Sequence, residues 1–73
     1  MGDAPLKVLE LLNDKGNDVS FSLILKQVGE VRDARYAVRN LHERNFAERN
    51  QENDTARITP LGEEFIRKYK EKH

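Results

Sequence analysis

The chain has 73 residues, of which 37% are hydrophobic and 36% charged, so we expect one small domain that spans residues 1–73. Its 13 Lys and Arg residues balance its 13 Asp and Glu residues, so it lacks the strong positive charge of proteins that coat nucleic acid. It contains no cysteine, which excludes disulfides and cysteine-ligated zinc. No apolar run approaches the about 20 residues that cross a bilayer, and the first residues lack a signal-peptide pattern, so we expect a soluble cytoplasmic protein without a membrane partner.

Two helices are predicted in the first part of the chain. Leucine and valine recur at three- and four-residue spacing over residues 4–15, which gives a helix an apolar stripe, and Gly16 suits its end. The segment Val19-Ser20-Phe21 is β-branched and aromatic, which predicts a short strand. Ser22 is then expected to cap a second helix that ends at Gly29.

A third helix is predicted over residues 33–45, with Asp33 as its N-cap. At 100° per residue, its small apolar side chains fall on one stripe and its arginines and tyrosine on the opposite face. We therefore expect one face in the core and the other in solvent. The apolar stripe comprises Ala34, Ala37, Val38 and Leu41, and the polar face comprises Arg32, Tyr36, Arg39 and Glu43, with Arg35 and Asn40 at its edges.

A β-hairpin and a last helix are predicted in the remaining chain. Residues 46–49 and 55–58 flank five polar, turn-prone residues, which predicts a hairpin with an exposed tip. Asn45, just before it, tolerates a left-handed backbone. Thr59 as N-cap and Pro60 as first helical residue predict the start of the last helix. Apolar residues recur every four positions at Leu61, Phe65 and Tyr69, with Ile66 beside them, and are expected to pack on the core.

Charge is distributed unevenly along the chain. Residues 1–31 carry a net charge of −2 and residues 32–73 a net charge of +2, and all seven arginines follow Val31. The planar guanidinium of arginine pairs with phosphates and guanine edges in a way that lysine cannot match. This asymmetry indicates either a recognition surface in the second half or an ordinary charge-rich exterior.

The order helix, short strand, helix, turn, helix, hairpin, helix resembles the winged helix-turn-helix, in particular the MarR-type and ArsR-type repressor domains. Their short strand and second helix are similar to the segment VSFSLILKQVG. Their third helix and first wing strand are similar to DARYAVRNLHERNFAER, and the end of their wing and closing helix are similar to ITPLGEEFIRKY. The resemblance implies an α+β, mainly helical fold with a three-helix core, a short hairpin wing and a C-terminal helix. The chain departs from the family pattern at Asn45, where glycine is usual, and by ending after its fourth helix, so no small-molecule ligand is expected.

The resemblance also implies a sequence-specific regulator of transcription, such as a repressor, that reads double-stranded DNA with helix 33–45 in the major groove. Arginine pairs with guanine and asparagine with adenine, whereas tyrosine contacts a phosphate or a thymine methyl group. Phosphate contacts are expected from Ser20 or Ser22, from Lys26 and from the arginines of the wing, with the acidic tip residues Glu52 and Asp54 pointing away. The expected DNA-binding residues are Arg32, Arg35, Tyr36, Arg39, Asn40, Ser22, Lys26, Arg49 and Arg57.

The sequence is also compatible with other functions. The sequence has no Ser–His–acid grouping, phosphate-binding glycine loop or cysteine nucleophile, so neither an enzyme nor a cofactor or metal site is expected. Because one domain would bind DNA weakly, we expect a homodimer on a two-fold site. The zero net charge also suits a winged-helix protein–protein interaction module without DNA binding, and RNA binding or a part in a replication or recombination machine is a third alternative.

Overall fold

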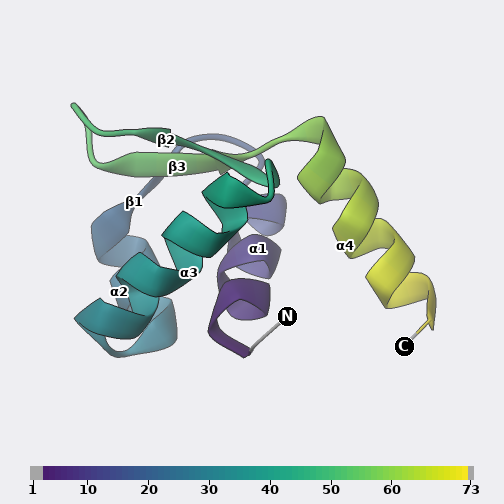
Figure 1. Cartoon of the computed structure of the whole chain (residues 1–73), viewed down its shortest axis with the longest axis horizontal. Helices are drawn as coiled ribbons and strands as arrows, with labels where there is room; N and C mark the ends of the chain where they lie inside the picture. Colours follow the sequence, from purple (N-terminus) through teal and green to yellow (C-terminus); the bar gives the residue numbers. More distant parts are fainter. Residues whose placement is uncertain (1–2, 73) are drawn as a thin grey trace.

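The computed structural model describes residues 3–72, and for Asp3 the backbone alone. Four helices and three short strands make an α+β, mainly helical fold in which the hairpin lies above α1 and α3 and the last helix stands to one side (Figure 1). The elements are α1 (Asp3–Lys15), β1 (Val19–Ser20), α2 (Phe21–Val28), α3 (Val31–Glu43), β2 (Ala47–Asn50), β3 (Thr55–Ile58) and α4 (Pro60–Lys72).

The core lies between the first three helices, the sheet and one residue of α4. The apolar stripe predicted for α3 is confirmed: Ala34, Ala37 and Leu41 are fully buried, and Val38 is 6% exposed. Two alanines on this stripe leave room for the larger side chains of neighbouring elements, so α3 can approach them closely. The largest buried side chains from those elements are Leu9, Leu12, Ile24 and Ile66.

The three strands form an antiparallel sheet in the order β1-β3-β2. β2 and β3 are the predicted hairpin, and β1 adds a two-residue edge in which Val19 pairs with Ala56 and Ser20 with Thr55. The buried Ala47 and Ala56 lie on the face toward the core. The central strand β3 is therefore held on both of its sides.

The second helix begins earlier than predicted. Ser20, not Ser22, is its N-cap, because the Ser20 hydroxyl oxygen accepts a hydrogen bond from the backbone N–H of Leu23 at 3.3 Å. Phe21 is the first helical residue and not the end of the strand. The backbone of Ser20 is extended (φ −68°, ψ 148°) and pairs with β3, so the helix starts directly after that pairing. The predicted end at Gly29 is confirmed by its left-handed conformation, φ 93°.

The third helix is also displaced toward the N-terminus. It begins at Val31 and ends at Glu43, and Glu30 takes the N-cap position without a side-chain hydrogen bond. The prediction of Asp33 as N-cap is therefore wrong. Asp33 lies in the first turn, where its carboxylate still interacts favourably with the helix dipole. The left-handed backbone predicted for Asn45 is confirmed, with φ 65°.

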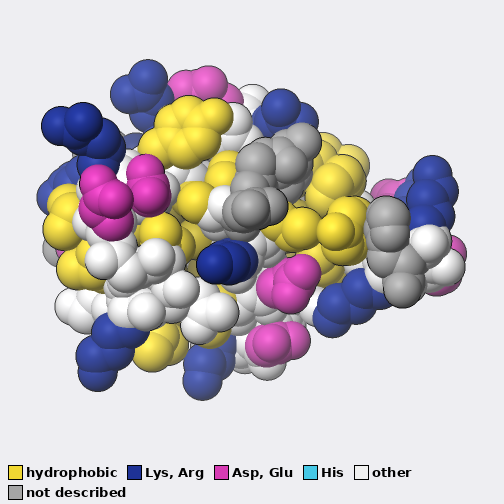
Figure 2. Space-filling model, turned by 90° about the horizontal axis from the view of Figure 1, so that it is seen from below, with side chains coloured by type: hydrophobic (Ala, Val, Ile, Leu, Met, Phe, Trp, Pro, Cys, Tyr) yellow, Lys and Arg dark blue, Asp and Glu magenta, His cyan; other side chains and the backbone are white. Residues whose placement is uncertain are grey.

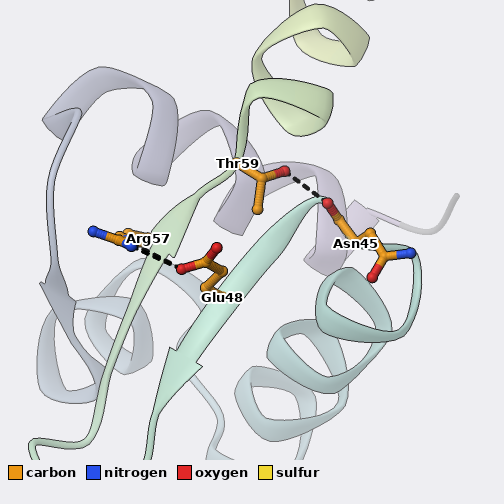
Figure 3. A network of polar contacts seen from close by, with 4 residues as sticks. All are labelled: Asn45, Glu48, Arg57 and Thr59. Carbon is orange, nitrogen blue, oxygen red and sulfur yellow. Dashed lines mark hydrogen bonds and ion pairs between the residues drawn. The ribbon is translucent and has the colours of Figure 1, made fainter.

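The start of α4 follows the prediction. The Thr59 hydroxyl accepts a hydrogen bond from the backbone N–H of Gly62 at 3.1 Å, as an N-cap does, and Pro60 is the first helical residue. The same hydroxyl donates to the carbonyl oxygen of Asn45 at 2.6 Å (Figure 3). One side chain thus connects the end of α3 with the beginning of α4.

The packing of α4 agrees only in part with the predicted apolar face. Phe65 is half-buried and stacks on Phe46 with ring centroids 4.8 Å apart, and the Tyr69 ring lies 6.5 Å from that of Phe65. Leu61, however, is 49% exposed, and Ile66 takes the buried position. On the side shown in Figure 2, hydrophobic side chains remain visible between the body of the molecule and the projecting end of α4. Within residues 3–72 no helix has the length and apolarity needed to cross a membrane.

Candidate nucleic-acid interface

The outer face of α3 and one residue of the hairpin line a shallow hollow of about 400 Å³. Every charged side chain that lines this hollow is an arginine, and the remaining lining residue is a tyrosine. The Tyr36 side chain is 58% exposed and all four arginines are exposed. Two elements separated in the sequence therefore present one basic surface. Its lining residues are Arg32, Arg35, Tyr36, Arg39 and Arg49.

The sheet register explains why Arg49 joins this surface. Successive side chains of a strand point to opposite faces, so Arg49 lies on the same face of β2 as the buried Ala47. Its cross-strand partner is Ala56, which is also buried, whereas the neighbouring pair on the other face is Glu48 and Arg57. Arg49 therefore extends from the core-facing side of the sheet, near the hairpin tip, toward α3.

The arginines of the hollow differ in their present partners. The Nε atom of Arg39 lies 3.4 Å from a carboxylate oxygen of Glu43 one helical turn later, and both side chains are largely exposed, so this ion pair adds little stability. The Arg35 guanidinium lies 5.2 Å from the centroid of the Phe21 ring. Within residues 3–72, the side chains of Arg32 and Arg49 make no hydrogen bond or ion pair. The donors of these two arginines are available to an anion.

Arg57, which was expected to contact phosphate beside Arg49, lies elsewhere. Its Nε and Nη2 atoms both donate to one carboxylate oxygen of Glu48, at 3.1 and 2.9 Å (Figure 3). This hydrogen bond, together with the charge of Glu48, raises the pKa of the Arg57 guanidinium. Arg57 lines a second hollow, which Arg49 also borders and which includes the acidic residues Asp18 and Glu52. The structure does not bring Arg57 together with the basic hollow, and its contact with phosphate stays a prediction.

Three further predicted site residues lie outside the hollow. Asn40 is half-buried, and its side-chain oxygen is buried without a hydrogen-bond partner in the described part of the chain. A bidentate contact with adenine uses that oxygen as acceptor, so the amide would have to turn outward first. Ser22 and Lys26 are exposed and lie four residues apart on one side of α2. That Ser22 and Lys26 contact phosphate stays a prediction.

One residue next to the hollow was missed by sequence reasoning. Phe21 was assigned to a strand, in which it would have had no relation to the third helix. In the structure it opens α2, and its ring lies against the side chain of Arg35. No local sequence signal identifies this contact, because it depends on where α2 begins and on how α2 packs beside α3.

Comparison of the sequence with models of protein families finds no match, and a search of curated proteins finds no significant match either. Within the described residues there is no group of three or more His, Asp or Glu side chains that could hold a metal ion. The function is therefore argued from the basic hollow and the elements that build it.

Proposed function

We propose that this chain is a winged helix-turn-helix protein that binds double-stranded DNA in a sequence-dependent way and regulates transcription. The order of elements and the pairing of β1 with β3 support this architecture. α2 and α3 are separated only by Gly29 and Glu30, a short turn of the kind that joins the two helices of this motif. In the proposal α3 lies in the major groove and the β2–β3 hairpin is the wing.

The observation that carries the proposal is the basic hollow itself. Four arginines from two elements surround it, although the whole chain has no net charge. Their planar guanidinium groups match the paired acceptors of phosphates and of the guanine O6 and N7 atoms. An α-helix with its side chains is about 10–12 Å wide, which fits a major groove about 12 Å wide.

The position of each residue along α3 suggests which part of the DNA it would contact. Arg35, Tyr36 and Arg39 face outward from the N-terminal two-thirds of the helix, the part that reaches base edges in helix-turn-helix complexes. Arg32, at the start of α3, and Arg49, on the hairpin, flank them on either side of the hollow. We assign base contacts to the first three and phosphate contacts to the flanking pair.

A second candidate function is a protein-interaction module without DNA binding. It is favoured by three large apolar side chains that remain exposed: Leu23 at 37%, Val31 at 48% and Leu61 at 49%. Two of them lie on α2 and α3, the two helices of the proposed motif, and the third lies on α4. Such side chains are also common singly on ordinary protein surfaces, so they weigh less than the converging arginines.

Titration with mixed-sequence duplex DNA at several salt concentrations separates the two functions. With four to six phosphate contacts, the logarithm of the binding constant should fall against the logarithm of salt with a slope of roughly −4 to −5. Selection of tight-binding sequences from a random pool should then return a common motif. Binding that is absent or insensitive to salt would reject the proposal and leave the interaction module.

The proposal includes two copies of the chain on a two-fold site, because a single domain has few contacts. Sedimentation with and without a selected DNA measures this directly. A two-to-one complex of protein and DNA is expected, with the selected motif repeated as an inverted pair. A single, unrepeated motif bound by one copy would contradict the dimer and leave DNA binding intact.

A further inference from the structure

The contact between Phe21 and Arg35 joins α2 to α3. We infer that Phe21 is a positioning residue for DNA recognition, whose ring holds the Arg35 guanidinium in the orientation that reads a guanine. The inference rests on the proposed function, because it concerns how the basic hollow recognises a base. The ring does not itself contact DNA in this arrangement.

The backbone position of Phe21 is set both by α2 and by a hydrogen bond to the hairpin. It is the first residue of α2, directly after the cap Ser20, and its backbone N–H donates to the carbonyl oxygen of Asp54 at 2.9 Å. Asp54 is the last residue of the hairpin tip and has a positive φ of 52°. The ring therefore starts from a backbone position set by the hairpin and by α2 together, and a side-chain substitution would leave that hydrogen bond in place.

Arg35 reaches from this ring to the basic hollow. It lines a second, small pocket of about 30 Å³, together with Phe21, Ile24 and Val38, and it also lines the large hollow beside Tyr36. A pocket of that size leaves little unfilled space among these residues, although Arg35 as a whole is exposed. The guanidinium is thus supported on one side and open to the hollow on the other.

The chemistry of an aromatic partner differs from that of a carboxylate. Arg39 and Arg57 each face a glutamate, which accepts from their N–H groups. An aromatic ring attracts the guanidinium through the negative face of its π-system, and it does not take up the N–H donors as a carboxylate oxygen does. Among the arginines of the hollow, Arg35 is the one whose guanidinium the structure places over a ring.

An oriented guanidinium with free donors is what a bidentate contact with guanine requires. Holding a side chain in its bound orientation removes part of the ordering cost of binding. The effect should appear at the base pair that Arg35 reads and not in the phosphate contacts. This separates a positioning role from a general loss of structure or charge.

The test uses a selected DNA site and a set of duplexes with each base pair replaced in turn. The base pair whose discrimination disappears in Arg35→Ala identifies the one that Arg35 reads. Phe21→Leu should lower the discrimination at that pair about two- to fivefold, the size of an exposed cation–π contact. Affinity for mixed-sequence DNA and the salt slope should stay unchanged. Phe21→Tyr keeps an aromatic face and should retain the discrimination of the wild type.

Phe46→Leu is the matched control, because Phe46 is also half-buried but stacks on Phe65 of α4. It should reduce stability without changing discrimination at the pair that Arg35 reads. If Phe21→Leu does not fold, Phe21→Met provides a second variant without the ring. Equal discrimination in the wild type and in a folded variant that lacks the ring would overturn the inference.

A measurement on the free protein separates this inference from the proposed function. The ring should shift the NMR signals of the Arg35 side-chain protons upfield, and the shift should vanish in Phe21→Leu. A wild type without this shift would refute the positioning role whether or not DNA binds. A wild type that shows the shift but discriminates between no DNA sequences would instead refute the proposed function, and with it the role of Phe21.

Discussion

The Thr59 hydroxyl donates a hydrogen bond to the backbone carbonyl oxygen of Asn45 at 2.6 Å, at the base of the hairpin (Figure 3). Asn45 has a left-handed backbone just after α3, and Thr59 is the N-cap of α4. The backbone N–H of Thr59 also donates to the carbonyl oxygen of Phe46 at 3.0 Å. These two bonds close the base of the hairpin.

Thr59→Ala should lower the free energy of unfolding by about 1–2 kcal/mol, because it removes both the helix cap and the bond to Asn45. Urea denaturation followed by circular dichroism measures the change. Thr59→Ser keeps the hydroxyl and should stay within about 0.5 kcal/mol of the wild type. An equal loss in both variants would show that the methyl group, and not the hydroxyl, stabilises this junction.

Gly62→Ala should destabilise the protein although alanine is the better helix former by about 1 kcal/mol. A Cβ atom at Gly62 would collide with the carbonyl oxygen of Phe46 and lie 2.9 Å from the Ile58 Cγ1 atom. We expect a net loss of about 1–3 kcal/mol in thermal unfolding. The control Arg67→Ala, at an exposed position of the same helix, should change stability by less than about 0.5 kcal/mol. A more stable Gly62→Ala would mean that α4 can move away from the hairpin at little cost.

Leu41→Ala should cost about 2–5 kcal/mol, because Leu41 is fully buried between α3 and its neighbours. A loss of this size would unfold much of so small a protein at room temperature. Leu61→Ala makes the same chemical change at a side chain that is 49% exposed and should cost less than about 1 kcal/mol. Chemical denaturation of the two variants side by side tests the assignment, and similar losses would contradict it.

Arg39→Ala should weaken binding to the selected DNA site by about 1–3 kcal/mol and leave the free energy of unfolding within about 0.5 kcal/mol. Its ion pair with Glu43 is exposed and contributes little to folding. Fluorescence anisotropy measures the binding. Arg67→Ala removes the same charge from α4, away from the hollow, and should have a much smaller effect. Equal weakening in both variants would indicate attraction to overall charge in place of recognition by α3.

The sequence predicts those features that depend on neighbouring residues. The spacing of Ala34, Ala37, Val38 and Leu41 identified the buried face of α3, because a helix repeats at a fixed angle. Asn45 and Thr59 could be assigned because a left-handed residue and an N-cap are local requirements. For the same reason Arg32, Arg35, Tyr36 and Arg39 were correctly expected to share one exposed face.

Features decided by distant residues could not be predicted in this way. Ser20 and Ser22 are equally good caps by type, and the choice between them follows from the pairing of Ser20 with Thr55, more than thirty positions along the chain. Arg49 and Arg57 likewise form a symmetrical pair in the sequence. The register of β2 and β3 places one with α3 and the other with Glu48.

The position of β1 ties the hairpin to the segment that leads into α2. Ser20 pairs with Thr55, and Thr55 also pairs with Asn50, so the strand pairing extends to the edge of the tip. If α3 and the hairpin keep this arrangement in the proposed complex, a duplex that bends toward both gains contacts. Sites with easily bent pyrimidine–purine steps would then be preferred over rigid A-tracts, even at base pairs that no side chain reaches.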